Sequence, residues 1–558
     1  MRGFVLAIVS LALASFTQMP TAQTDKISEK QAAPVSGRVL TAAEGAPIKS
    51  ARVALVEENA SSHPRVFAAT TDSDGRFEIK KVSPGRYHFF AAHTGYISQE
   101  YQAQGTRDGA LLTLAPGRGV ENALFRLVRA GVVSGRVVDE EGEPMAKVLV
   151  TALRRPSAEE KEDWGARARK EQLVASSAAV TDDHGEYRIF GLKPGEYYVK
   201  TAESEIPGLP GTANEEDAMD WTVRSNLGSQ YAPVFYPGVL QLDQAQPVTV
   251  AAGEEVQAEF AMRRVKTVEI QGHVIAADSR PATHAYVLLY VPEVDDWGDQ
   301  LSAGTDAKGE FTIKGVPPGS YILSGQQHDG DKHYRARQRV EVGNDNIESI
   351  VIAFGKGRTI NGHVVAASPG ASALDRIHIQ LEPAGESDTE GFGGAQVKQG
   401  GSFEINDVLD GSYALQVYGM EQGWYVTSAR LGAEDVLQKG LQVERGSSTG
   451  RLEIILSSAS AQLEGAVSDH DKPAVGAQVR VKPDPETRYN RQRSNNTSTD
   501  QNGRFIFHAL APGKYRVTAR LRSASSEAPV TTSDAKIVTL GEHDHQAVQL
   551  MLATPQTE

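Results

Sequence analysis

The sequence predicts an all-β protein built as a tandem array of five seven-stranded β-sandwiches. Three observations lead to this prediction: a recurring pair of glycines, an alternating apolar pattern after the first glycine, and turn residues about every 8 to 12 positions. The pattern reads Thr-Asp-x-x-Gly-x-Phe/Tyr and, ten residues after its glycine, a second glycine in Pro-Gly-x-Tyr. The glycine pairs are Gly75/Gly85, Gly185/Gly195, Gly309/Gly319, Gly401/Gly411 and Gly503/Gly513. Constant internal spacing indicates repeated small domains, whereas a catalytic site usually occurs once in a chain.

The first copy shows how each element follows from its residues. Between Asp72 and Gly75 we expect a turn in which the carboxylate caps backbone amides and the glycine takes a positive φ. Phe77 and Ile79 then share one face while their neighbours share the other, the period of a half-buried strand. The strands expected in this copy are 35–40, 52–56, 66–70, 76–80, 87–92, 111–114 and 123–128.

The same inward positions recur in the later copies. The aromatic and its apolar partner two residues on are Tyr187/Ile189, Phe311/Ile313, Phe403/Ile405 and Phe505/Phe507. Burying one such pair contributes roughly 3 to 6 kcal/mol, so we interpret these positions as core.

The residues Thr-Asp-x-x-Gly-x-Phe and Pro-Gly-x-Tyr resemble the carboxypeptidase regulatory-like domain. That family has a transthyretin-like β-sandwich, often grouped with carbohydrate-binding-like folds. The resemblance implies an accessory module, which in the family accompanies a peptidase or an outer-membrane receptor. It covers nearly all of the chain after its first residues. The fourth copy departs most, with Gln399-Gly400 and Asp410 at its turn positions.

The chain divides into an expected export signal and five expected domains. A positive residue, Arg2, precedes a short apolar run, which predicts a signal peptide over 1–23. The second domain carries a charged insert, 154–172, and a long excursion over 203–237, where function is often placed. The expected domains are 34–129, 130–264, 266–356, 358–458 and 461–553.

Composition limits the classes of function. The net charge of −14 over 558 residues argues against a nucleic-acid partner, because phosphates need a basic surface. With no cysteine, disulfides, thiolate metal sites and cysteine nucleophiles are excluded. No later segment is apolar for long enough to predict a membrane helix. We therefore expect an exported protein that is periplasmic, secreted or on the outer surface.

A search for catalytic chemistry predicts none. No histidine is followed three residues later by glutamate, so the zinc pair of a metallocarboxypeptidase is missing. Histidine and aspartate gather at 328–333 and 543–545 without a full ligand set, and the Asp72 loop is better explained as a capped turn than as a calcium site. The Gly-x-Ser-x-Gly match at 446–450 precedes a strand rather than a helix. We expect no cofactor, no metal and no enzyme activity.

Three of the four tryptophans follow an aspartate. An exposed indole can stack on a sugar ring while a nearby carboxylate accepts hydroxyl hydrogen bonds, which predicts a carbohydrate contact. The other interpretation is that each indole packs over its own sandwich or between domains. The candidate ligand-binding residues are Asp163, Trp164, Asp220, Trp221, Asp296 and Trp297.

The main hypothesis is a non-catalytic, exported binding and scaffold protein whose modules add weak contacts by avidity. Its partner would be a polysaccharide or an envelope protein. Two alternatives stay open: carbohydrate recognition through the Asp-Trp loops, and an accessory role for a separate receptor or peptidase.

Overall fold

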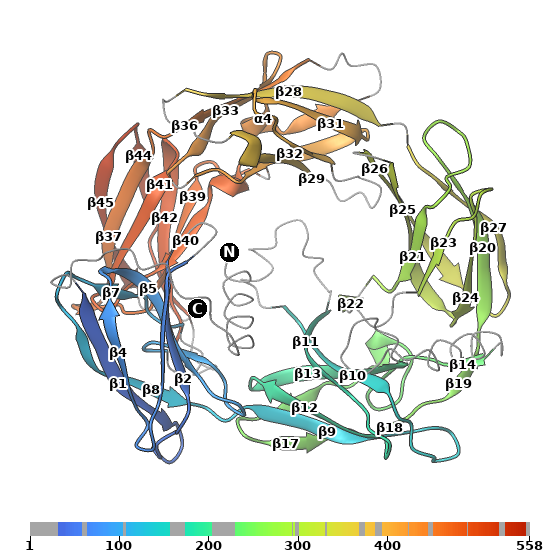
Figure 1. Cartoon of the computed structure of the whole chain (residues 1–558), viewed down its shortest axis with the longest axis horizontal. Helices are drawn as coiled ribbons and strands as arrows, with labels where there is room; N and C mark the ends of the chain where they lie inside the picture. Colours follow the sequence, from blue (N-terminus) through green and yellow to red (C-terminus); the bar gives the residue numbers. More distant parts are fainter. Residues whose placement is uncertain are drawn as a thin grey trace.

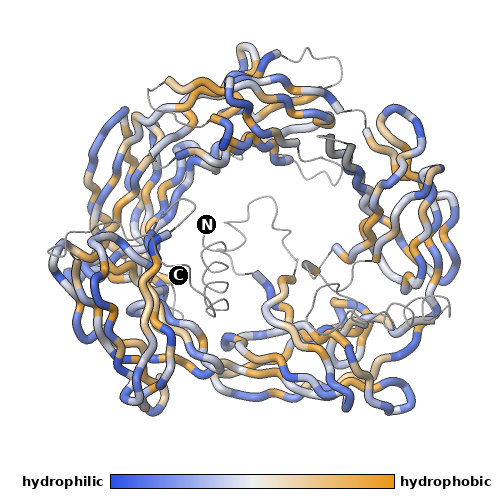
Figure 2. The backbone as a smooth tube through the Cα atoms, viewed as in Figure 1, coloured by the Kyte–Doolittle hydropathy of each residue, from blue (hydrophilic) through white to orange (hydrophobic). Residues whose placement is uncertain are grey.

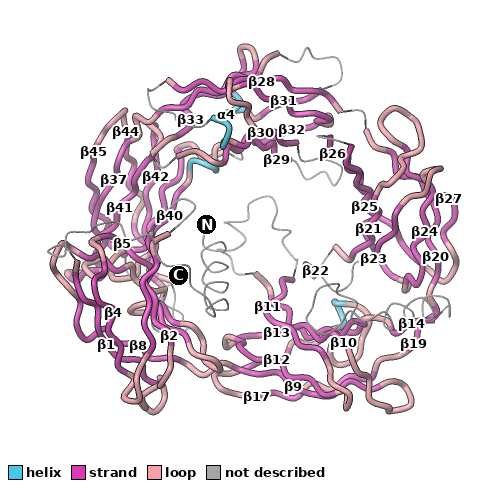
Figure 3. Tube along the Cα trace, in the orientation of Figure 1, coloured by secondary structure: helices cyan, strands magenta, loops and turns pink. Residues whose placement is uncertain are grey.

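The fold is nearly all β, with a few helical turns (Figure 3). A computed structural model describes residues 32–58, 64–103, 108–156, 173–203, 229–292, 294–295, 301–329, 332–355, 357–367, 374–384, 393–421, 423–444, 450–487, 489–523 and 530–553. The expected signal peptide, most of the charged insert, much of the 203–237 excursion and the serine of the Gly-x-Ser-x-Gly match lie outside these residues.

Five stretches of the described chain each surround a hydrophobic core of their own. We call them units 1 to 5, spanning 33–127, 131–261, 268–353, 358–457 and 461–553. Apolar and polar residues alternate along their strands (Figure 2), as expected where one face of a sheet packs inward.

Unit 1 shows the plan of all five. Its outer sheet has β1 at the centre, antiparallel to β4 and parallel to the last strand, β8. The strands are β1 (Ala33–Thr41), β2 (Arg52–Glu57), β3 (Val66–Thr70), β4 (Arg76–Val82), β5 (Gly85–Ala92), β6 (Gln99–Glu100), β7 (Leu112–Leu114) and β8 (Val120–Leu127). The second sheet has the order β3-β2-β5-β6, with β7 also on β5. All seven expected strands are present, and β6 is additional.

Unit 2 repeats the plan with a longer second sheet. The strands are β9 (Gly131–Val138), β10 (Val148–Arg154), β11 (Leu173–Val180), β12 (Glu186–Leu192), β13 (Gly195–Glu203), β14 (Ser229–Tyr231), β15 (Val234–Phe235), β16 (Val248–Val250), β17 (Glu255–Gln257) and β18 (Phe260–Ala261), with the 3-10 turn η2 (Leu242–Gln244). After unit 2, β19 (Arg264–Lys266) pairs with β14 and leads into unit 3.

Unit 3 has two sheets, with the orders β24-β20-β27 and β23-β21-β25-β26. The strands are β20 (Val268–Ile275), β21 (Tyr286–Tyr290), β22 (Val294–Asp295), β23 (Leu301–Gly304), β24 (Glu310–Val316), β25 (Gly319–Asp329), β26 (Lys332–Val342) and β27 (Ile347–Ala353). The short strand β22 leaves its own unit and pairs with β11 of unit 2.

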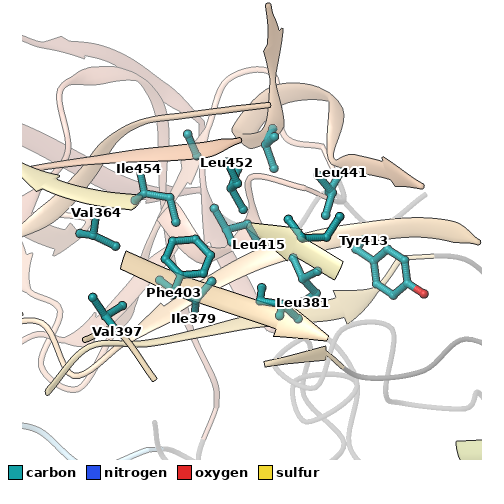
Figure 4. Close-up of a cluster of buried hydrophobic side chains, with 14 of the residues drawn as sticks. Val364, Ile379, Leu381, Val397, Phe403, Tyr413, Leu415, Leu441, Leu452 and Ile454 are labelled. Atoms are coloured by element: carbon teal, nitrogen blue, oxygen red, sulfur yellow. The ribbon is translucent and has the colours of Figure 1, made fainter. Parts of the chain in front are cut away.

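Unit 4 has sheets with the orders β31-β28-β36-β33-β34 and β30-β29-β32-β35. The elements are β28 (Arg358–Ala366), η3 (Leu374–Arg376), β29 (His378–Pro383), β30 (Gly393–Gln396), β31 (Ser402–Val408), β32 (Gly411–Tyr418), β33 (Tyr425–Leu431), β34 (Glu434–Asp435), α4 (Val436–Lys439), β35 (Leu441–Val443) and β36 (Leu452–Ser457). Figure 4 shows its core, where Phe403 and Leu415 lie between side chains of both sheets.

In unit 5 the strands join into one continuous sheet, because β43 pairs with both β42 and β45. The elements are β37 (Ala461–Asp469), β38 (Lys472–Pro473), β39 (Gln478–Pro483), η4 (Arg491–Arg493), β40 (Asn495–Ser498), β41 (Arg504–Leu510), β42 (Gly513–Leu521), β43 (Thr531–Ser533), β44 (Lys536–Leu540) and β45 (His545–Ala553). Strand β40 forms one end of this sheet.

In units 1, 2, 3 and 5 a glycine at the centre of the first strand lets the last strand approach in parallel, whereas Gly362 of unit 4 makes room for the Phe403 ring. A Cβ added at Gly37 would lie 1.9 Å from the carbonyl oxygen of Ala123, and one at Gly465 would lie 2.1 Å from that of Val548. No side chain fits such a gap, which explains the glycine of the opening Gly-x-Val segments.

The five units follow one another around a ring (Figure 1). In each unit the sheet of the first strand, such as β1 or β20, lies on the outer side of the ring. The sheet of the second strand, such as β10 or β29, lies on the inner side (Figures 1 and 3). Every unit has the same orientation in the ring, and the first and last units are in contact where the ring closes.

Candidate functional site

The repeated aspartate caps the turn that precedes each unit's fourth strand. Asp72 Oδ1 accepts hydrogen bonds from the backbone N–H groups of Asp74 at 2.9 Å and Arg76 at 2.8 Å. Asp182, Asp306 and Asp500 make the same two bonds in units 2, 3 and 5. The N–H groups of Glu310 and Lys308 hold the pKa of Asp306 below its usual value. These carboxylates therefore cap backbone N–H groups of the turn, as the capped-turn interpretation predicted.

The threonine before this aspartate ties two strands together. Thr71 Oγ1 accepts from the N–H of Ala51 at 2.8 Å and donates to the carbonyl of Ile48 at 2.6 Å. Thr181, Thr305 and Thr499 repeat both bonds. All four threonines are buried, so the motif threonine is also structural.

The motif tyrosine closes the Pro-Gly turn. In all five units its hydroxyl donates to the backbone carbonyl four residues earlier, at 2.7 to 3.0 Å. The residues are Tyr87, Tyr197, Tyr321, Tyr413 and Tyr515. Burial raises the pKa of Tyr321 and of Tyr515 to about 12, so both hydroxyls remain donors at neutral pH. The constant position of this tyrosine could have indicated the bond from the sequence.

Unit 4 keeps the turn without the side-chain bonds. Val397 and Lys398 stand where the other units have threonine and aspartate. The backbone alone closes the turn, through Gly401 N–H to the Lys398 carbonyl at 2.8 Å. Gln396 instead reaches the carbonyls of Asp375 and Ile377 through its Nε2. This side chain therefore replaces part of the missing threonine contact.

The six predicted ligand-binding residues Asp163, Trp164, Asp220, Trp221, Asp296 and Trp297 all lie outside the described residues. The carbohydrate contact therefore stays a prediction. The fourth tryptophan, Trp424, is partly buried and packs against the core of unit 4.

No catalytic or metal constellation is found within the described residues. None of their histidine, aspartate and glutamate side chains gather in groups of three or more that could hold a metal ion. A hollow of about 450 Å³ opens on unit 4, where Lys398, Glu404 and Arg451 form part of its lining. The hollow mixes both signs of charge and contains no paired nucleophile and base.

The most extensive polar contact between units joins unit 1 to unit 5. Leu111 forms a parallel bridge with Asp500. The side chain of Gln501 accepts from the N–H of Thr113 at 3.0 Å and donates to its carbonyl at 2.8 Å. A Cβ on Gly476 would lie 2.7 Å from the carbonyl oxygen of Asp108, so the backbones meet closely.

A largely buried ion pair lies in the same junction. Arg86 Nε and Glu58 Oε2 are 2.7 Å apart, and their side chains are 15% and 8% exposed. Thr497 Oγ1 of β40 donates to Glu58 Oε1 at 2.8 Å, and Arg86 donates to the carbonyl of Ser498 at 3.4 Å. Thr497 and Ser498 are both buried although β40 is the last strand of its sheet, because unit 1 covers this edge.

Successive units make other contacts. Between units 1 and 2, the linker residue Arg129 forms a bridge with Tyr96 of unit 1, with its guanidinium 5.9 Å from the tyrosine ring centroid. The carbonyl of Arg129 also accepts from the N–H of Gly253 in unit 2 at 3.0 Å. Units 2 and 3 bury a cluster containing Leu153, Leu173, Phe235 and Val294. Units 4 and 5 meet where Arg493 donates to the carbonyl of Val426 at 3.2 Å.

These features define an all-β protein of repeated sandwich modules. The carboxypeptidase regulatory-like domain model matches residues 34–116 and 462–550. The chain therefore contains carboxypeptidase regulatory-like domains in units 1 and 5, the two units that close the ring. The family resemblance expected from the motif is confirmed for these two units.

Among curated proteins, the chain is similar to subunits of the BOS complex. Human NOMO1 and NOMO3 are each 28% identical over 307 residues, which cover 52% of this chain and 20% of the relative. Mouse NOMO1 is 24% identical over 307 residues, covering 52% of this chain and 21% of the relative. The chain thus spans about a fifth of the length of these relatives.

Solved pilin structures give weaker likenesses. A streptococcal ancillary pilin is 12% identical, covers 58% of this chain and 98% of its own, and has a TM-score of 0.19. The minor pilin GBS52 of Streptococcus agalactiae is 16% identical, covers 42% and 97%, and has a TM-score of 0.22. Scores this low support no conclusion about the arrangement or activity of the chain. Of the helices in the described residues, none has the length and apolar character to cross a bilayer.

Proposed function

We propose that this chain is a non-catalytic, exported binding and scaffold protein of the cell envelope. Each unit would be one independently folding module, with the bounds 34–129, 130–264, 266–356, 358–458 and 461–553. Residues 1–23 would direct export. The partner would be a protein or polysaccharide of the envelope, including a separate receptor or peptidase that the modules assist.

One observation carries this proposal. The residues that define the repeat make hydrogen bonds that stabilise the fold: aspartates cap turns, threonines join strands and tyrosines close the Pro-Gly turn. Repeated modules with fixed orientation present several surfaces at once, which suits binding of an extended or multivalent partner.

A two-part experiment tests the proposal. The purified chain without residues 1–23 is incubated with peptide, ester and glycoside substrates, and in parallel is used to capture partners from an envelope extract. We expect no turnover and reproducible retention of a defined envelope component. Turnover by the chain alone would contradict the non-catalytic part, and loss of every retained component after washing at physiological salt would contradict the binding part.

Carbohydrate recognition is the second candidate, motivated by the Asp-Trp pairs of the sequence. A glycan array with the wild-type chain and with Trp164→Ala/Trp297→Ala tests it. Glycan binding that is lost in the double variant supports the sugar contact. Binding that is absent, or unchanged by both substitutions, removes it.

A further inference from the structure

Strand β26 of unit 3 differs from its counterparts in the other units. It pairs with β25 along eleven residues, from Gly319↔Val342 to Asp329↔Lys332. The strands in the same position elsewhere pair over three to five residues: β7, β16, β35 and β44. Unit 3 therefore has additional inner sheet surface that the fold of the other units does not require.

The two faces of β26 differ sharply. Tyr334, Val340 and Val342 pack against the core of unit 3. The alternate residues Arg335, Arg337 and Arg339 therefore lie on the opposite face of the sheet. Figures 1 and 3 place the sheet of β21 and β25 on the inner side of the ring. We call these three residues the arginine row.

Within the part of the chain that the structure describes, the arginine row has no acidic partner. Among the ion pairs and hydrogen bonds of the described residues, none involves these three guanidinium groups. The next residue on this face, Glu341, accepts instead from Ser320 Oγ at 2.6 Å. In a protein with a net charge of −14, three adjacent cations without a partner are not explained by folding alone.

Two buried polar atoms lie at the centre of the row. Arg337 Nε and Ser324 Oγ are both buried without a hydrogen-bond partner. Ser324 is paired directly with Arg337 in the sheet and is 1% exposed. Burial lowers the pKa of Arg335, and the charge of Arg337 lowers it further. A bound anion would relieve the repulsion between Arg335 and Arg337.

Tyrosines border the row on the same face. Across the three strands β21, β25 and β26, Tyr286 pairs with Gln326, which pairs with Arg335. In the same way Tyr290 pairs with Ile322, which pairs with Arg339. Tyr286 is 49% exposed. The surface thus combines guanidinium forks with aromatic side chains, a combination that is common in protein-binding surfaces.

We propose that the arginine row binds an extended acidic polypeptide segment with carboxylates at alternate residues. Alternate residues of a strand lie about 7 Å apart, so the row spans about 14 Å. One phosphate or carboxylate is too small to meet all three guanidiniums. An extended peptide repeats its alternate side chains at the same spacing, and each carboxylate meets one arginine fork. The inference names the partner chemistry of the binding protein proposed above and rests on that proposal.

Fluorescence anisotropy of labelled peptides with the full chain tests the proposal. One peptide carries three glutamates at positions i, i+2 and i+4 between threonines. A second carries them at i, i+3 and i+6, which places neighbouring carboxylates on opposite faces of an extended chain. We expect the first peptide to bind about five- to tenfold more tightly, and both to weaken as salt is raised.

Substitution identifies the surface. The triple variant Arg335→Gln/Arg337→Gln/Arg339→Gln should lower affinity for the first peptide at least about tenfold. Arg337→Lys keeps the positive charge but loses the planar guanidinium that can donate two parallel hydrogen bonds, so it should lower the affinity by a smaller factor. The matched control Arg38→Gln/Arg76→Gln/Arg126→Gln removes three charges from the outer sheet of unit 1 and should leave affinity within about twofold. Circular dichroism of each variant verifies folding.

Three results would overturn the inference. They are equal binding of the two peptides, equal loss in the outer-sheet control, or tighter binding of a sulfated oligosaccharide or single-stranded oligonucleotide that depends on the same arginines. If the envelope extract still supplies a retained partner for the triple variant, the scaffold proposal holds and only the arginine row loses its role.

Discussion

The junction between units 1 and 5 differs from the junctions between successive units. Successive units are joined by the chain itself, so even a weak contact such as that of Arg129 with Tyr96 keeps them in place. Thr113 and Gln501 are 388 residues apart in sequence and must meet without such help. The closing junction accordingly contains the buried Glu58–Arg86 pair and a polar strand edge. We therefore predict that closure of the ring depends on these side chains, because the chain does not connect units 1 and 5 directly.

Among the changes considered, Glu58→Lys should destabilise the junction between units 1 and 5 most. The new ammonium group would face Arg86 and leave Thr497 without its acceptor, and breaking a buried pair typically costs about 3 to 5 kcal/mol. We expect the ring to open between units 1 and 5. Small-angle X-ray scattering would then show a larger radius of gyration and a longer maximum dimension.

The neighbouring pair supplies the control for this substitution. Glu57 pairs with Arg65 inside unit 1, and their side chains are more exposed, at 23% and 45%. Glu57→Lys should leave the scattering profile unchanged. Equal opening by both variants would show that charge reversal, rather than the closing junction, is responsible.

Gln501→Ala should have an intermediate effect. It leaves the N–H and carbonyl of Thr113 without a partner in a partly buried place, which should destabilise the closed ring by roughly 1 to 3 kcal/mol. Hydrogen exchange should accelerate at the Thr113 amide. Asn502→Ala, which changes an exposed side chain one residue away, should leave that amide protected. Unchanged exchange in Gln501→Ala would mean that this contact does not hold the ring.

Arg129→Ala should have a small effect, because it lies at a junction that the chain already connects. Loss of the cation–π contact costs about 0.5 to 1 kcal/mol at a largely exposed site. We expect a slightly lower melting temperature and an unchanged scattering profile. An opened ring in this variant would remove the distinction between the two kinds of junction.

The pH dependence at His508 should be the smallest effect. Burial lowers the pKa of His508, while the charges of Glu58 and Arg86 raise and lower it respectively. Because the neutral imidazole is favoured in the closed ring, its contribution is present above about pH 6.5 and is lost as pH falls through the lowered pKa. Proton NMR should show a titration midpoint below 6.5. In Glu58→Lys the opened ring releases the imidazole from burial, so the midpoint should move upward, whereas in a ring that stayed closed the exchange of an anion for a cation would move it downward. A midpoint that does not move would place the cause within unit 5.

The sequence predicts local structure well for physical reasons. Asp72 and Gly75 indicate a capped turn because few other residues satisfy its backbone, and Phe77 and Ile79 mark the inward face by their period. The two hydrogen bonds that buried Thr71 makes through its hydroxyl were not predicted, since threonine is also common on exposed strands.

The functional surfaces were harder to predict. The contact of Thr113 with Gln501 joins distant segments and leaves no periodic signal. The alternation of Arg335, Arg337 and Arg339 is visible in the sequence, but which acidic side chains of the described chain lie near them is a property of the fold. The Asp-Trp pairs were the residues that the sequence favoured, and they remain a prediction.

The most direct test of ring closure uses the absence of cysteine from the chain. In the double variant Thr113→Cys/Asn502→Cys, only these two residues can react with a short bis-maleimide. Gln501, next to residue 502, lies within 3.0 Å of Thr113, so we predict an efficient cross-link within single chains in dilute solution. The same double variant carrying Glu58→Lys should cross-link poorly. Chains that carry only separate single adducts, or that link only into dimers, would contradict the closed ring.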